Sequence, residues 1–133
     1  MACGGSKPIA YDDITSQLRG RVEFPRLVRS IFHTRADFVS YLEDTMPGRA
    51  PSVPAIDFAH REAILIASGP RSSTGYKLRV VSVRETRDRV AVNVKETSPQ
   101  LGEPVTARLT YPFVLITIPQ NAKSLFLHFE GRP

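Results

Sequence analysis

The sequence has few of the residues that form cross-links and metal clusters. Among its 133 residues there is one cysteine, Cys3, and no tryptophan. A single cysteine excludes an internal disulfide and a cysteine-based metal cluster. The three histidines, His33, His60 and His128, are far apart, and no cluster of potential ligands has metal-binding spacing. No glycine-rich loop has a phosphate-binding pattern. We therefore expect no metal and no cofactor.

The composition is that of a folded globular domain. Hydrophobic residues make up 41% and charged residues 23% of the chain, which is an ordinary balance. No apolar run approaches the roughly 20 residues of a membrane-spanning helix. The net charge of +5 raises the question of a nucleic-acid partner. However, the arginines alternate with acids, as in residues 84–89, so we expect a solvated surface and no nucleic-acid partner.

The first residues predict a location. We interpret residues 1–20 as an N-terminal tail and residues 21–133 as a single domain. The segment Ala2-Cys3-Gly4-Gly5-Ser6 looks like the junction at which bacterial lipoprotein precursors are cut. This interpretation predicts that Cys3 carries a lipid anchor, which is the only membrane contact, in the bacterial cell envelope (periplasm or outer membrane). It implies a signal peptide before the printed sequence. The alternative is a chance cysteine in a loose chain end.

A helix is predicted after residue 34. Thr34 can cap it, with Asp37 three residues on, and Phe38 and Leu42 share one face. Pro47 and Gly48 then end the helix. Short apolar or alternating segments surround it, separated by turn residues. They are residues 21–32 (an edge strand or bend, because of Pro25), 63–68, 76–83, 90–95, 105–111, 113–118 and 124–130.

This pattern predicts an α+β, mainly β fold. We expect an antiparallel β-sheet or sandwich of about six to seven short strands with one α-helix. The apolar run 63–68 should be buried on both faces. The predicted core contains Val80, Val92, Leu109, Leu115 and Ile116.

The loop between residues 68 and 77 is the candidate binding surface. Gly75 can take positive φ and Pro70 fixes φ on the other limb, so the loop should have a defined shape. Arg71 can form charge-assisted bonds with a partner carboxylate, and Tyr76 is a common hot-spot residue type. The predicted site is Gly69, Pro70, Arg71, Ser72, Ser73, Thr74, Gly75 and Tyr76. The alternative is a plain solvated hairpin loop.

Catalysis has weaker support. Asp57 and His60 form an acid–histidine pair, for which Ser72 or Ser73 would have to supply a nucleophile. Neither serine lies in a Gly-x-Ser-x-Gly elbow. Asp57 is also a typical turn residue that accepts backbone N–H bonds. We therefore assign no catalytic residue.

Several short motifs resemble the PrcB C-terminal domain family, which is known from bacterial protease-complex subunits. The motifs are Pro54-Ala55-Ile56-Asp57-Phe58, Gly69, Thr74-Gly75-Tyr76, Glu96-Thr97-Ser98-Pro99 with Gly102, Thr110-Tyr111-Pro112-Phe113 and Ile118-Pro119. The resemblance spans roughly residues 31–119. It implies a small β-rich accessory domain whose protein partner is a protease of the subtilisin-like class.

Three functions remain open at this point. The first is a non-catalytic envelope module that associates with or regulates a protease. The second is a protease inhibitor, because Ser73-Thr74-Gly75-Tyr76 is similar to the Thr-Gly-Tyr loop of chagasin-like inhibitors, although their tryptophan motifs are missing. The third is a small hydrolase that uses Asp57 and His60.

Overall fold

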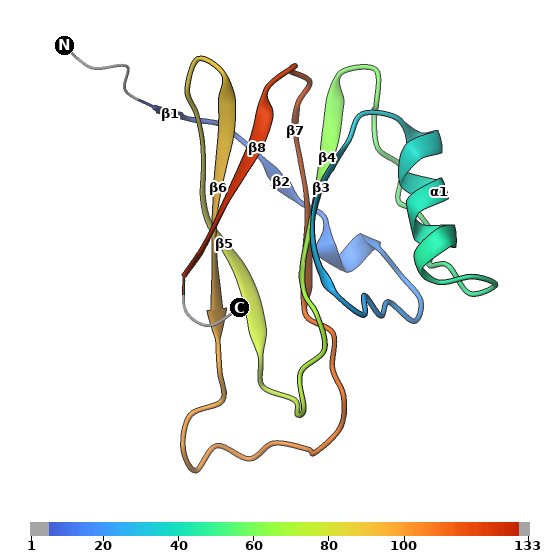
Figure 1. The fold of residues 1–133 in the computed structure, drawn as a ribbon, viewed down its shortest axis with the longest axis vertical. Helices are drawn as coiled ribbons and strands as arrows, with labels where there is room; N and C mark the ends of the chain where they lie inside the picture. Colours follow the sequence, from blue (N-terminus) through green and yellow to red (C-terminus); the bar gives the residue numbers. More distant parts are fainter. Residues whose placement is uncertain (1–5, 131–133) are drawn as a thin grey trace.

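The computed structural model describes residues 6–130 (Figure 1). Its six longer strands and one helix are β3 (Leu27–Phe32), α1 (Arg35–Thr45), β4 (Arg61–Ser68), β5 (Lys77–Glu85), β6 (Arg89–Thr97), β7 (Phe113–Pro119) and β8 (Ser124–Glu130). Before them lie the short β1 (Lys7–Pro8) and β2 (Asp12–Asp13) and a 3-10 turn, η1 (Thr15–Gln17). The predicted mainly β, α+β fold is confirmed.

The strands form two four-stranded sheets, in the orders β1-β5-β6-β8 and β2-β7-β4-β3. Neighbouring strands are antiparallel except for β6 and β8, which are parallel. One apolar cluster fills the space between the sheets, with alternate residues such as Val92 on β6 and Ile116 on β7. The molecule is therefore a β-sandwich.

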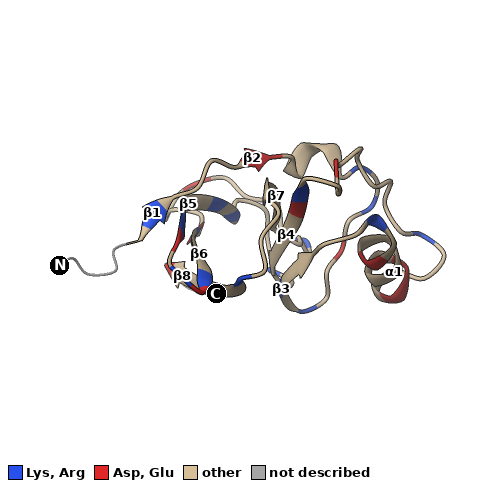
Figure 2. Cartoon of the chain, turned by 90° about the horizontal axis from the view of Figure 1, so that it is seen from above, with Lys and Arg blue, Asp and Glu red and all other residues tan. Residues whose placement is uncertain are grey.

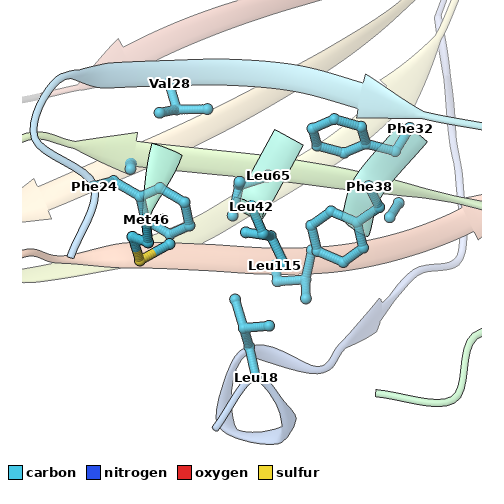
Figure 3. Packing of buried hydrophobic residues seen from close by; sticks show 11 residues of the cluster. Leu18, Phe24, Val28, Phe32, Phe38, Leu42, Met46, Leu65 and Leu115 are labelled. Atoms are coloured by element: carbon cyan, nitrogen blue, oxygen red, sulfur yellow. The ribbon is translucent and has the colours of Figure 1, made fainter. Parts of the chain in front are cut away.

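A second apolar cluster lies on the other face of the β2-β7-β4-β3 sheet. There Phe38 and Leu42 of α1 are fully buried against β3 and β4 (Figure 3). The view from above in Figure 2 shows the resulting layers, with α1 beside β3 and β4 and away from the other sheet. Because β4 lies between two apolar clusters, its residues 62–68 are all buried. The predicted burial of both faces is confirmed.

The helix begins as its capping signal predicts. The Thr34 hydroxyl oxygen accepts a hydrogen bond from the Asp37 N–H at 3.1 Å. This bond satisfies one of the N–H groups that have no partner inside the helix. The helix ends at Thr45, before Pro47 and Gly48.

Residues expected in the N-terminal tail lie on both sheets. β1 pairs with Arg84 and Glu85 of β5, and β2 pairs with β7. Leu18 is only 4% exposed and belongs to the helix-side cluster. Cys3 lies outside the described residues.

The predicted strand at residues 105–111 is wrong. Residues 98–112 form a long loop, in which Leu109 is 64% exposed, so its predicted burial is also wrong. The segment alternates in polarity, but no strand within residues 6–130 lies beside it, and the flanking Pro104 and Pro112 cannot donate ladder hydrogen bonds. The other predicted core residues, Val80, Val92, Leu115 and Ile116, are buried as expected.

Candidate functional site

The loop at residues 69–76 crosses from one sheet to the other. It follows β4 and precedes β5, which belong to different sheets. It is therefore a crossover between the sheets, and the hairpin geometry expected for a plain solvated loop is wrong. Figure 1 shows it at one end of the sandwich, next to the loop at residues 98–112. We call these two segments the crossing loop (69–76) and the facing loop (98–112).

A buried ion pair holds the crossing loop. Arg71 donates two hydrogen bonds to Glu96, from Nε to Oε2 at 2.9 Å and from Nη2 to Oε1 at 2.8 Å. The side chain of Glu96 is 2% exposed and that of Arg71 is 18% exposed. The hydrogen bonds to Glu96, more than the partial burial that opposes them, raise the pKa of the Arg71 guanidinium. Arg71 thus bonds a carboxylate of its own chain, and not a partner's carboxylate as predicted from the sequence.

Backbone bonds tie the crossing loop to the facing loop. Arg71 and Thr110 exchange N–H···O bonds of 2.8 and 2.9 Å. The Thr74 N–H donates to the Thr106 carbonyl at 3.0 Å, and the Thr106 N–H donates to the Thr74 hydroxyl oxygen at 2.8 Å. The Thr110 hydroxyl donates to the Ser73 carbonyl at 2.8 Å. The crossing loop is therefore fixed at several points along its length.

Gly75 is required where the two loops touch. Its φ is +98°, which confirms the predicted positive value. A Cβ at this position would lie 2.8 Å from Pro99 Cγ and 3.2 Å from Val105 Cγ1. Any other residue here would therefore force the facing loop away.

The solvent-facing part of the site consists of exposed loop residues and an aromatic groove. Pro70 and Ser72 are exposed, whereas Gly69 is buried. A shallow groove of about 380 Å³ begins where the crossing loop enters β5. It is lined by Tyr76, Lys77, Leu78, Tyr111, Pro112 and Phe113. The Arg71 guanidinium carbon lies 5.9 Å from the centre of the Tyr76 ring, within cation–π range.

Glu96 and Tyr111 belong to the site but are not among the residues predicted from the sequence. A signal for Glu96 was present, because it continues the inward series Val90, Val92 and Val94 of β6. A carboxylate at an inward position needs a cation, and the crossing loop supplies it. Tyr111 has no comparable local signal, since the groove is formed only when the two loops pack together.

The predicted acid–histidine pair is present but isolated from the serines. Asp57 Oδ2 and His60 Nδ1 are 2.8 Å apart, on side chains that are 60% and 81% exposed. The hydrogen bond from His60 lowers the pKa of Asp57. This pair precedes β4, whereas Ser72 and Ser73 follow it, and eight strand residues span about 26 Å. The structure does not bring these residues together as a triad.

Glu62, at the same end of β4, is a second buried carboxyl group. Its Oε1 accepts a bond from the Asn121 N–H at 3.0 Å and lies 3.3 Å from His33 Nδ1. Its Oε2 is buried and has no hydrogen-bond partner within residues 6–130. Burial therefore raises the pKa of Glu62, although the neighbouring Asn121 and His33 lower it in part.

Two features are absent from the described residues. In residues 6–130 no three or more His, Cys, Asp or Glu side chains are grouped so that they could hold a metal ion. Over the same residues, no helix has the length and apolarity that a membrane crossing requires.

One family model matches part of the chain. A family model described as PrcB C-terminal matches residues 63–119, which confirms the predicted resemblance over that stretch. The matched residues run from β4 to β7 and include both loops of the site. Residues 54–58, part of the resemblance in the sequence, lie outside the match. No curated protein and no solved structure matches the chain.

Proposed function

We propose that this protein is a non-catalytic interaction domain that associates with a protease in the bacterial cell envelope. The observation that carries the proposal is the PrcB C-terminal match over residues 63–119, because the name indicates a protease complex and the matched residues build the candidate surface. The surface comprises the exposed residues of the crossing loop and the aromatic groove beside it.

The geometry supports binding more than catalysis. The crossing loop is held by the bidentate Arg71–Glu96 pair and by backbone bonds, so it presents its exposed residues in one arrangement. Preorganised surfaces lose less conformational entropy on binding. In contrast, Asp57 and His60 have neither Ser72 nor Ser73 as a neighbour.

The envelope location rests on the sequence around Cys3. We propose that Cys3 carries the lipid anchor, since Ala2-Cys3-Gly4-Gly5 has the residues of a lipoprotein junction. One acyl chain binds membranes only marginally, so a multiply acylated cysteine is expected. Mass spectrometry of the native protein should detect the diacylglyceryl adduct on Cys3, and an unmodified thiol would contradict this location.

A capture experiment tests the association. The tagged full chain is incubated with an envelope fraction, and the bound material is assayed for proteolysis with and without added domain. We expect a protease among the bound proteins, and the absence of one would overturn the proposal. Lowered activity of the captured protease would favour the chagasin-like inhibitor alternative. Raised or unchanged activity would favour an accessory subunit.

A matched pair of variants locates the contact. Ser72→Arg adds a bulky cation to the exposed part of the crossing loop, and Ser40→Arg makes the same change on the exposed face of α1. We expect Ser72→Arg to weaken capture and Ser40→Arg to leave it unchanged, with equal thermal melting of both. Equal capture by the two variants would exclude the crossing loop from the interface.

A further inference from the structure

In the described part of the chain, most of one edge of β5 has no neighbouring strand. β6 covers one side of β5 along its length. On the other side, β1 pairs only with Arg84 and Glu85, and the Ile9 N–H donates to the Val83 carbonyl. Among residues 6–130, nothing pairs with Lys77–Ser82 on that side. Six strand residues extend about 20 Å, which is enough for a short added strand.

The aromatic groove opens beside this free edge. Lys77 and Leu78 of β5 form one wall, while Tyr111 and Phe113 contribute from the facing loop and β7. A peptide strand places alternate side chains on opposite faces, so one of its side chains can point into the groove while its backbone pairs with β5. The edge and groove together have the two features of β-strand addition, in which backbone bonds give affinity and a pocket gives specificity.

The charge at the edge indicates which strand fits. Lys77 and Arg79 are exposed on β5, and neither forms an ion pair with any residue in the described part of the chain. Arg79 lies opposite Lys95 of β6, which adds a further cation. A second copy of β5 would bring Lys77 and Arg79 against their own counterparts, and like charges across a strand pair are destabilising. An acidic strand would instead place carboxylates opposite Lys77 and Arg79, and opposite charges across a strand pair are stabilising.

We propose that the Lys77–Ser82 edge accepts an extended acidic segment of a protein partner as an added strand, with one apolar or aromatic side chain of that segment in the groove. That the segment belongs to a protease rests on the proposed function. The cations on this edge discourage pairing with a second copy of the chain and leave the edge open to an acidic strand.

A peptide probe tests the edge directly. The probe is a fluorescein-labelled nonapeptide in which glutamates alternate with valines and a tyrosine stands at the centre. Fluorescence anisotropy with the full chain should give saturable binding. Two control peptides should bind at least about tenfold more weakly. One replaces the glutamates by lysines, and the other carries N-methyl groups on alternate backbone amides, which removes the donors that an added strand needs.

Variants of the protein locate the peptide. Lys77→Glu combined with Arg79→Glu should lower the affinity for the acidic peptide at least about tenfold. Arg26→Glu combined with Arg29→Glu makes the same charge change at β3, in the other sheet, and should leave that affinity unchanged. Circular dichroism melting confirms that both double variants fold.

A second matched pair of variants tests the groove. Tyr111→Ala removes a ring that lines the groove and should lower the affinity for the peptide. Leu109→Ala alters an exposed residue of the same loop and should leave that affinity unchanged. Equal affinity of these two variants would overturn the assignment of the groove.

Two outcomes would overturn the proposal as a whole. One is equal loss of probe binding in both charge-reversed double variants. The other is a concentration-dependent dimer of the unmodified chain that the β5 variant abolishes, because the occupant would then be a second copy.

Repeating the capture experiment with the β5 variant distinguishes failure of this proposal from failure of the proposed function. A protease that binds the β5 variant as tightly as the unmodified chain contradicts the edge and leaves the association intact. Probe binding at the edge without any captured protease contradicts the association and supports the edge.

Discussion

Replacing Arg71 by methionine removes the cation from a buried ion pair and leaves its carboxylate behind. Methionine keeps much of the arginine stem but cannot donate to Glu96, whose side chain is 2% exposed. Breaking a buried pair in this way costs about 3–5 kcal/mol. The two charge-assisted hydrogen bonds give a similar figure, since each contributes about 1.5–3 kcal/mol. We therefore expect the free energy of unfolding of Arg71→Met to fall by about 3–5 kcal/mol.

Urea denaturation measures this loss, provided that the dependence on denaturant is the same for each variant. Arg71→Lys retains the positive charge but cannot form the bidentate pair with Glu96, so it should lose less stability than Arg71→Met. The double variant Arg71→Met, Glu96→Leu removes both charges and should recover most of the loss. A loss below about 1 kcal/mol in Arg71→Met would refute the reasoning, because that is the range of an exposed pair. A double variant no more stable than the single one would refute it as well.

Three further predictions concern stability. Gly75→Ala should cost about 1–3 kcal/mol and more than Gly48→Ala, since both have positive φ but only the first meets the facing loop. Leu115→Ala should cost about 2–5 kcal/mol, and Leu109→Ala less than about 0.5 kcal/mol, in urea titrations, because only Leu115 is buried. Comparable losses within either pair would contradict the assigned environments. Because the pKa of Glu62 is raised above its ordinary value of 4.5, the unfolded chain loses this proton first as the pH rises. The stability of Glu62→Gln relative to the unmodified protein should therefore increase between pH 4 and pH 7.5, and a constant difference would contradict this.

The elements predicted well from sequence are those with strong local signals. Thr34 and Asp37 locate the start of α1, because a helix cap is made by residues three positions apart. Val90, Val92 and Val94 alternate and fall on the inward face of β6, as expected for a half-buried strand. The continuous apolar run of β4 predicts its burial on both faces.

The errors have a common physical cause, which is that pairing partners are not encoded locally. The segment 105–111 alternates like a strand, but no strand among the described residues forms a ladder with it, so Leu109 remains exposed. The short connection from β4 to β5 is typical of a hairpin, yet the two strands belong to different sheets. Arg71 and Glu96 are 25 residues apart, and no local pattern reveals that they bond.

This ion pair connects the core of the sandwich to both proposed surfaces. The inward face of β6 is apolar through Val94 and then reaches Glu96, a carboxylate that needs a cation in order to stay buried. The crossing loop supplies Arg71, and its backbone is then held against the facing loop. That contact places Tyr76 and Tyr111 at the start of β5, next to the unpaired edge. Arg71, whose charge allows Glu96 to stay buried, therefore also holds the two loops in one arrangement before a partner binds. This lowers the entropic cost of the binding that we propose.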